Sequence, residues 1–173
     1  MIGNPDNTMK NKRLQTQLND EIGTFLTQQQ SLMLSSINDA GFPHASYAPF
    51  VNHNNELLIF ISQLAAHTQH LLTTGKAGVL MIEDEASSDD VFARTRLSYQ
   101  MKVEVIARDD VFWLEGIALL KQKLGDRIDL LSQLGDFVLF RLIPVEGRYV
   151  KGFGRAYEIS PGSLVAELSH ITK

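Results

Sequence analysis

Cysteine is absent from this 173-residue chain, and its absence removes several classes of chemistry. Disulfide bonds, thiolate zinc sites, iron–sulfur clusters and thiol nucleophiles all need that side chain. Long apolar runs are missing as well, so no stretch is long enough to cross a membrane as a helix. The first residues lack the apolar core of a signal peptide. We therefore expect a cytoplasmic protein that does not engage a membrane.

A strong positive charge is also missing. The formal net charge is −4, which argues against a nucleic-acid binder driven by attraction to phosphates. No glycine-rich phosphate loop is present, because Gly152-Phe153-Gly154 is too short to form one. What remains is an ordinary composition, with 44% apolar and 21% charged residues. It predicts one globular domain with a sizeable core and terminal arms.

The chain divides into three parts. Residues 1–11 are polar and are predicted to form a disordered N-terminal arm. Residues 12–157 form the predicted domain, and residues 158–173 a C-terminal tail. From residue 12 a helix is expected, because apolar residues recur at helical spacing at Leu14, Leu18, Ile22, Phe25 and Leu26.

Short apolar runs separated by turn residues predict an antiparallel sheet. The expected strands cover residues 31–38, 44–51, 56–62, 77–82, 95–107, 137–143 and 147–152. Helices are expected over 63–74, 112–124 and 126–134, and a short one over 164–168. A single helix between the third and fourth strands argues against parallel βαβ units. The fold class is therefore mainly β with peripheral helices, a six- to seven-stranded antiparallel split barrel, because closure removes sheet edges.

Two histidines could act together. His67 and His70 lie three residues apart on one predicted helix and could project together as metal ligands. No carboxylate lies at a neighbouring helical position, so the simpler interpretation is a packed, hydrogen-bonded His67 and an exposed His70. We interpret His44 and His53 as surface residues, since no serine or carboxylate lies at a recognisable spacing.

Four further side chains have two interpretations each. Arg94 and Arg96 share the polar face of the strand over 95–107. They either belong to a solvated face or form a clamp for a carboxylate or phosphate. Asp136 opens an apolar strand, as a strand-entry residue or a functional carboxylate. His170 stands near the end of the chain, either as a surface residue or as an axial ligand of iron.

Four motifs in order carry a family resemblance. They are Ser62-x-Leu64-Ala65-x-His67-Thr68-x-x-Leu71, Phe92-Ala93-Arg94-x-Arg96-Leu97-Ser98, Asp136-Phe137-x-Leu139-Phe140-Arg141-Leu142-x-Pro144 and Gly152-Phe153-Gly154-Arg155-Ala156. Together they resemble the haem-utilisation proteins of the HugZ/HutZ type, relatives of pyridoxamine 5′-phosphate oxidase with the FMN-binding split-barrel fold. The resemblance covers about residues 12 to 173.

The resemblance implies a homodimer with its ligand sites at the subunit interface. It also implies that haem is bound and its porphyrin cleaved by O₂, with electrons from an external donor. The proximal ligand of the haem iron would be His170, with Asp136, from the same or the other subunit, hydrogen-bonded to it. The resemblance would place Arg94 or Arg96 on the distal side or at the propionates, with Arg96 preferred as the catalytic residue. His67 is a further candidate cofactor-binding residue.

Two alternatives remain beside haem degradation. One is an FMN-dependent oxidoreductase of the pyridoxamine-phosphate oxidase type, and the other is a non-catalytic haem storage or carrier protein. Flavin enzymes of this fold place basic residues on the second and third strands to hold the phosphate. Here residues 44–51 and 56–62 contain no Arg or Lys, which favours the haem branch.

Overall fold

A computed structural model describes residues 5–165 and 168–171 of the chain. Within these residues eight strands form one antiparallel sheet, in the order β3-β2-β1-β4-β5-β6-β7-β8. The strands are β1 (Ser31–Ile37), β2 (Pro43–His53), β3 (Glu56–Ser62), β4 (Lys76–Ile82), β5 (Arg96–Ile106), β6 (Phe137–Val150), β7 (Ala156–Ile159) and β8 (Leu168–His170). The helices are α1 (Pro5–Gln28), α2 (Ala66–Thr74), α3 (Trp113–Leu124) and α4 (Arg127–Ser132), with a 3-10 turn η1 (Glu85–Ser87).

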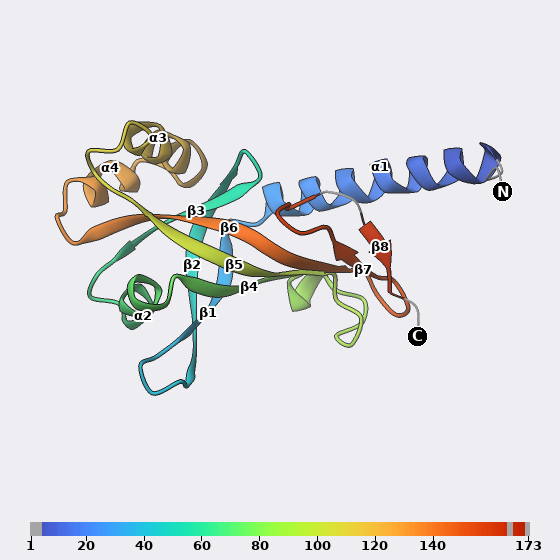
Figure 1. The fold of residues 1–173 in the computed structure, drawn as a ribbon, viewed down its shortest axis with the longest axis horizontal. Helices are drawn as coiled ribbons and strands as arrows, with labels where there is room; N and C mark the ends of the chain where they lie inside the picture. The colour runs from blue at the N-terminus through green and yellow to red at the C-terminus, as the bar shows by residue number, and fades with distance from the viewer. Residues whose placement is uncertain (1–4, 166–167, 172–173) are drawn as a thin grey trace.

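The sheet closes because β3 also pairs with the first half of β6, from Leu57 opposite Leu142 to Ser62 opposite Phe137. Strands β1 to β6 thus form a barrel, and β7 and β8 extend the sheet beyond the second half of β6 (Figure 1). Closure satisfies backbone groups that an open sheet would leave unpaired. The predicted mainly β, antiparallel split barrel with peripheral helices is confirmed, with the short strands β7 and β8 as additions.

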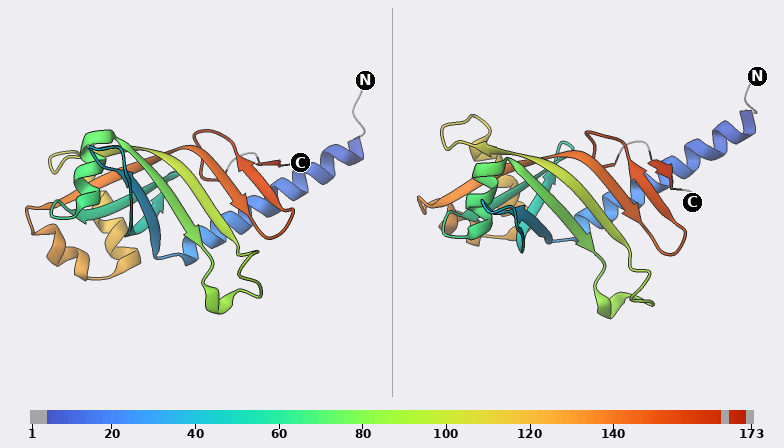
Figure 2. Two further views of the ribbon diagram at one scale, coloured as in Figure 1. Left: turned by 90° about the horizontal axis from the view of Figure 1, so that it is seen from below. Right: turned by 60° about the horizontal axis from the view of Figure 1, so that its bottom comes forward.

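One stripe of α1 packs against the barrel core. Leu18, Ile22 and Leu26 are at most 2% exposed and share an apolar cluster with Leu34 and Phe140. Their spacing of four residues places them on one helix face, as predicted. The N-terminal part of α1 extends away from the barrel (Figures 1 and 2). No helix in the described part of the chain has the length and apolar character needed to span a membrane.

The outer side of β3 is covered by α3 and α4, which explains why five consecutive residues, Leu57–Ile61, are buried. The odd-numbered residues of this run belong to the barrel cluster. The even-numbered residues belong to a second cluster with Trp113 and Ile117 of α3. A strand buried on both faces shows a continuous apolar run instead of alternation. Both helices lie at one end of the molecule, as Figure 1 shows.

The sequence predicts two strands around Pro144, and this is wrong. β6 continues without a break through Pro144 and Gly147. Its register against β5 shifts between Gln100, which lies opposite Glu146, and Met101, which lies opposite Pro144. A bulge leaves one residue unpaired, and strands tolerate a proline at such a place although it donates no hydrogen bond. One strand therefore links the closed barrel to the β7–β8 extension.

Other predictions change in detail. Helix α1 begins at Pro5, so the described residues of the segment expected to be disordered are helical, while residues 1–4 lie outside the described part. Proline fits the first turn of a helix, where its missing N–H is not needed. The short helix predicted over 164–168 is absent at the positions described there, and Leu168 begins β8. The boundary predicted after residue 157 falls inside β7.

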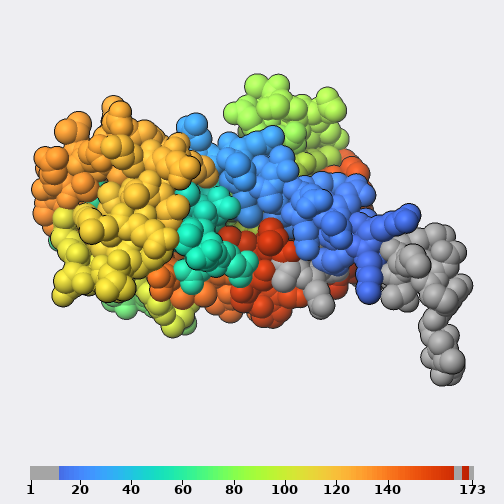
Figure 3. All heavy atoms as spheres, turned by 90° about the horizontal axis from the view of Figure 1, so that it is seen from above, coloured from blue at the N-terminus to red at the C-terminus, as the bar shows by residue number. Residues whose placement is uncertain are grey.

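The acidic loop between β4 and β5 stands out from the body (Figure 3).

Candidate functional site

The C-terminal segment presents His170 on the outermost strand of the sheet. Tyr157 lies opposite His170 in the β7–β8 pairing, and their rings meet edge to face with centroids 5.2 Å apart. The N–H of Ile171 donates to the carbonyl of Ala156 at 2.8 Å, which continues the ladder by one residue. His170 itself is exposed. The strongest sequence candidate for a metal ligand is therefore ordered and accessible on an edge strand.

The hydrogen bond of His170 defines its available nitrogen. Nε2 lies 2.9 Å from the carbonyl oxygen of Gly154. A carbonyl only accepts, so in a neutral ring Nε2 carries the hydrogen and Nδ1 carries the lone pair. A metal binds the unprotonated nitrogen. Coordination through Nε2 would therefore require release of the Gly154 carbonyl, whereas Nδ1 of the neutral ring has its lone pair free.

Asp136 lies immediately before β6 and is held by β3. Its Oδ2 accepts a hydrogen bond from the Oγ hydroxyl of Ser62 at 2.5 Å, and its backbone carbonyl accepts from the N–H of Gln63 at 2.7 Å. Ser62 Oγ in turn accepts from the N–H of Leu64 at 3.1 Å. Ala65 occupies the N-cap position of α2, so Ser62 does not cap that helix and orients Asp136 instead. The carboxylate is half-buried at the closed end of the barrel.

Asp136 and His170 lie at opposite ends of β6 within one chain. Asp136 precedes Phe137, the first residue of the strand, whereas His170 is linked through Tyr157 to Tyr149 near its last residue. Twelve residues of strand at about 3.3 Å each separate these two ends by roughly 40 Å. The two residues can therefore meet only if they come from different copies of the chain.

Arg94 is engaged in its own loop. Its Nε donates to the carbonyl of Glu83 at 2.8 Å, its Nη2 donates to the same oxygen, and its Nη1 bonds Oε1 of Glu85 at 3.1 Å. These contacts fasten the start of β5 to the end of β4 and to η1. The guanidinium is committed to the loop, and the structure favours Arg96 as the arginine available to a ligand.

Arg96 faces a hollow of about 460 Å³ beside the turn between β6 and β7. Its Nη1 donates to the carbonyl of Arg94 at 3.2 Å. Arg148 lines the same hollow, and the register makes it a diagonal neighbour of Arg96, because it pairs with Ser98. Two like charges on one sheet face repel each other, and the pairing of Arg148 with Glu158 of β7 at 3.8 Å offsets only part of this repulsion. The exposed rings of Phe92 and Phe153 complete a cationic and aromatic lining.

The sheet register places Arg96 and His170 on opposite faces. Arg96, Val150 and Ala156 lie in one row across β5, β6 and β7. His170 belongs to the adjacent row, which runs through Tyr149 and Tyr157 and faces the other way. Gly154 links the two sides, since it lines the hollow and its carbonyl bonds His170.

His67 is placed away from this hollow, on the first turns of α2. Burial lowers its pKa most, and the neighbouring His44 and His70 lower it further. His70 bonds Ser36 through Nδ1 at 3.0 Å, and its ring meets His44 with centroids 5.2 Å apart. No group of three His, Cys, Asp or Glu side chains in the described residues could hold a metal ion. His70 is half-buried and hydrogen-bonded instead of exposed, and His44 packs against it instead of standing free at the surface as the sequence suggests.

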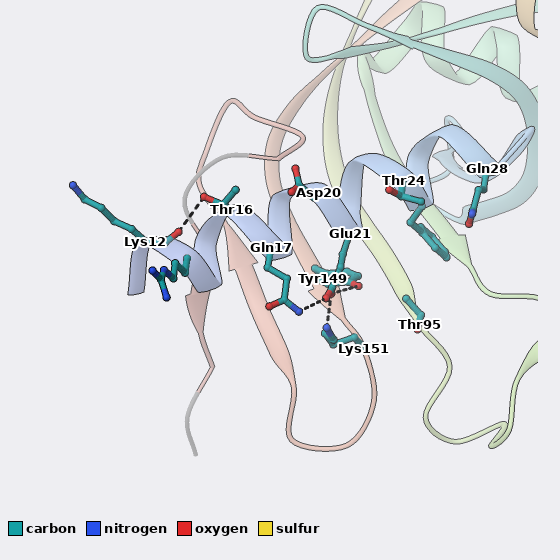
Figure 4. Close-up of a pocket in the computed structure, with 12 residues that line it drawn as sticks. Lys12, Thr16, Gln17, Asp20, Glu21, Thr24, Gln28, Thr95, Tyr149 and Lys151 are labelled. Atoms are coloured by element: carbon teal, nitrogen blue, oxygen red, sulfur yellow. Dashed lines mark hydrogen bonds and ion pairs between the residues drawn. The ribbon is translucent and has the colours of Figure 1, made fainter. Parts of the chain in front are cut away.

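A larger hollow of about 840 Å³ lies between α1 and the sheet. Figure 4 shows Glu21 of α1 reaching Gln17, Tyr149 and Lys151. Burial alone would raise the pKa of Glu21, but hydrogen bonds from Lys151, Gln17 and Tyr149 and the charge of Lys151 outweigh it, and the pKa is lowered. The hollow is lined by none of the candidate site residues from the sequence, which are Asp136, Arg94, Arg96, His67 and His170. Its polar network fastens α1 to the sheet.

Sequence reasoning missed two residues that the structure brings to the site region. Arg148 joins Arg96, and its place inside the strand predicted over residues 147–152 carried a signal for it. Asn55 bonds the C-terminal segment from a turn more than one hundred positions earlier in the sequence. No local pattern could have indicated that long-range contact.

A family model described as pyridoxamine 5′-phosphate oxidase matches residues 18–151. The chain belongs to the pyridoxamine 5′-phosphate oxidase family. The match runs from Leu18 in α1 to the residue after β6, so it covers the barrel and leaves out the tail with His170. Membership of the family accounts for the fold, while the tail needs separate comparison.

Individual relatives extend the likeness beyond the barrel. The chain is 40% identical over 160 residues to Heme oxygenase HutZ of Vibrio cholerae, covering 92% of this chain and 91% of that protein. A crystal structure of HutZ, described as the heme storage protein from Vibrio cholerae, has a TM-score of 0.74 and 39% identity, covering 79% of this chain and 96% of that one. Campylobacter jejuni ChuZ has a TM-score of 0.80 and 27% identity, covering 90% of this chain and 63% of that one. The resemblance to the HugZ/HutZ type is confirmed.

Proposed function

We propose that this protein binds haem and cleaves its porphyrin with O₂ and external electrons, which releases the iron. The observation that carries the proposal is the 40% identity to Heme oxygenase HutZ across nearly the whole of both chains. The geometry agrees with it, because the C-terminal segment presents an accessible imidazole. His170 is the only histidine after residue 70. A cytoplasmic location stays a prediction of the sequence.

In this proposal His170 is the axial ligand of the haem iron. Imidazole is a common ligand of haem iron, and an exposed edge strand can bring it to a large planar ligand without disturbing the barrel. Tyr157 fixes the ring plane by its edge-to-face contact. The iron and porphyrin supply the redox chemistry, and the protein contributes ligation and orientation.

The proposal includes a homodimer. Asp136 and His170 lie at opposite ends of β6 in one chain, so only a second copy could supply Asp136 to His170. A carboxylate that accepts the remaining N–H of a ligating histidine raises its basicity and fixes its orientation. Ser62 already holds one oxygen of Asp136, which leaves Oδ1 for an imidazole N–H. Whichever ring nitrogen binds the iron, Nε2 of His170 would release the carbonyl of Gly154, either to coordinate the iron or to donate to Asp136.

Arg96 and Arg148 are proposed to hold the anionic groups of a haem whose iron is bound by His170 of a second copy, because within one chain these arginines and His170 lie on opposite faces of the sheet. Haem carries two propionates, and guanidinium groups bind carboxylates by paired, charge-assisted hydrogen bonds. The hollow that both arginines line has aromatic rings at its rim, which suit the apolar part of a porphyrin.

Storage of haem without cleavage is the second candidate, because the HutZ crystal structure is described as that of a heme storage protein. It would use the same residues and leave the porphyrin intact. An FMN-dependent oxidoreductase is supported by the family match. The lack of Arg and Lys on β2 and β3, where phosphate would be held, weakens it.

Titration with hemin tests the proposal. We expect a saturable Soret band with the wild-type protein and a shifted, weakened band with His170→Ala. His44→Ala is the matched control, because it removes an imidazole at the other end of the molecule. An unchanged band in His170→Ala would overturn the ligand assignment.

The second step separates the three functions. With ascorbate in air, the Soret band of the bound hemin should decay and a ferrous chelator should report released iron. A Soret band that persists under these conditions would identify storage. A yellow protein with a flavin spectrum, purified without added cofactor, would identify the flavin alternative.

A further inference from the structure

We propose that Asn55 is a positioning residue that anchors the root of the segment carrying His170. Its side chain bonds residues 162–164 of the tail from the turn between β2 and β3. Anchoring itself concerns the free protein. The effect of this anchor on haem binding rests on the function proposed above. The attachment of the tail and its effect on haem are therefore tested by separate measurements.

The turn has a geometry that asparagine tolerates better than most residues. Asn54 and Asn55 have φ angles of 45° and 67°, and they join the paired residues His53 and Glu56. Two consecutive left-handed residues are typical of a two-residue hairpin turn. Both asparagines therefore fit the backbone equally, and only the contacts of their side chains distinguish them. Asn54 Nδ2 contacts the ring of His53, whereas Asn55 reaches the tail.

Asn55 makes three hydrogen bonds to the tail. Its Nδ2 donates to the carbonyl of Gly162 at 2.8 Å. Its Oδ1 accepts from the N–H of Leu164 at 2.7 Å and from the hydroxyl of Ser163 at 3.0 Å. One amide thus satisfies backbone groups on both sides of Ser163, which fixes the direction of the chain there as well as its position.

A buried tyrosine supports the same segment from inside the barrel. Tyr99 Oη donates to the carbonyl of Leu164 at 2.8 Å, and the Leu164 side chain is 3% exposed within the core cluster. Burial raises the pKa of Tyr99, so its hydroxyl keeps the hydrogen that it donates. Leu164 is therefore held on one side by Asn55 and on the other by Tyr99.

The anchor limits where His170 can go. Leu164 lies six positions before His170, and six extended residues reach at most about 20 Å. If the segment detached, the last firmly held residue would be Ile159 in β7, and eleven residues would reach about 35–40 Å. A longer tether lowers the effective concentration of a tethered group at its site. The three paired residues of β8 add a short ladder to this attachment.

Asn55→Gly tests the anchor, and Asn54→Gly is its matched control. Glycine adopts a positive φ without strain, so both substitutions preserve the turn and only Asn55→Gly removes the bonds to the tail. In the free protein, exchange of the Ile171 amide is measured by NMR, because its acceptor Ala156 lies away from the turn. We expect about tenfold faster exchange in Asn55→Gly than in Asn54→Gly. Equal exchange rates in the two variants would overturn the anchor.

Haem provides the functional measurement. Hemin-loaded proteins are mixed with apomyoglobin, and the rate of hemin transfer is recorded. We expect about tenfold faster transfer from Asn55→Gly than from Asn54→Gly, at equal thermal stability of the two barrels. Equal transfer rates would overturn the positioning role even if the tail is loosened. If the hemin spectra of the wild-type protein and of His170→Ala are the same, the ligand assignment is overturned, while the amide-exchange result still stands.

Discussion

Ser62 donates its hydroxyl hydrogen to Oδ2 of Asp136 across 2.5 Å, and this bond joins the last residue of β3 to the residue before β6. It lies where the barrel closes, next to the pairing of Ser62 with Phe137. Asp136 therefore has a local structural role at the barrel seam whether or not a second copy brings His170 to it. The structural role needs only an oxygen that accepts a hydrogen bond from Ser62, whereas a role beside a ligating histidine needs the negative charge. A substitution can therefore separate the two roles.

Asp136→Asn is expected to preserve the seam and impair haem chemistry. The amide retains an oxygen that accepts from Ser62, so the free energy of unfolding in urea should change by about 1 kcal/mol or less. Loss of the negative charge beside a ligating histidine should slow the ascorbate-driven decay of bound hemin by about 10–100-fold. Ser62→Ala is the contrasting variant, since it removes the donor to Asp136 and the acceptor of the Leu64 N–H. It should destabilise the fold by about 1 kcal/mol. An Asp136→Asn protein that degrades hemin at the wild-type rate would leave the carboxylate with its structural role alone.

Substitutions of Arg94 and Arg96 are expected to differ in effect although the two residues are only two positions apart. Arg96→Met removes a guanidinium that faces the hollow, and loss of one charge-assisted hydrogen bond should weaken hemin affinity by about 10–100-fold. Arg94→Met breaks the bonds to Glu83 and Glu85, so the loop between β4 and β5 should become more sensitive to protease. Its hemin affinity should stay within about twofold of the wild-type value, because its contacts lie in the loop. Equal losses of hemin affinity in the two variants would contradict the assignment.

Local patterns predicted most of the fold. Strict alternation identified the buried face of β5 from Leu97 to Val103, and continuous apolar residues identified β3. Continued alternation would also bury Val105. This fails at the end of β5, where Val105 is 51% exposed and Ile106 is buried. It also failed at Pro144, because a shift in the pairing with β5 decides whether a proline interrupts a strand. Pairing partners are a non-local property that no single segment encodes.

The candidate site was predictable in its residues and not in its arrangement. Motifs singled out Asp136 and Arg96, and the family resemblance singled out His170, but the register of β5 to β8 decides that Arg96 and His170 lie on opposite faces. The length of β6 decides that Asp136 and His170 lie far apart in one chain. Asn55 was hidden for a similar reason, since its partner segment follows more than one hundred residues later.

Gly147→Ala should loosen the tail from the inside of the barrel. A Cβ at this position would lie 2.7 Å from Cδ1 of Tyr99, whose rigid ring must move to accept it. Overpacking of this kind costs about 1–3 kcal/mol in the free energy of unfolding. Displacement of Tyr99 would also weaken its bond to Leu164, so amide exchange at Ile171 should accelerate. Gly23→Ala in α1 is the control, because its new methyl group would meet no atom within 4 Å apart from the adjacent backbone of its own helix. It should stabilise the protein by about 0.5–1 kcal/mol and leave that exchange unchanged.

Lys123→Met should stabilise the protein, and the gain should depend on pH. The ammonium of Lys123 lies 3.9 Å from the centroid of the buried Phe50 ring and has no hydrogen-bond partner among the described residues. Burial lowers the pKa of Lys123 to about 8. Below that pH the folded protein must keep a charge away from water, so the variant should gain about 1 kcal/mol at pH 7. Between pH 8 and about 10.5 the unfolded chain binds more protons at this residue than the folded protein does. The wild-type protein therefore recovers stability as pH rises, and the advantage of the variant should shrink across this window. Urea unfolding of both proteins at pH 7 and pH 9.5, with the exposed Lys76→Met as control, measures the difference, and a constant advantage at both pH values would contradict the prediction.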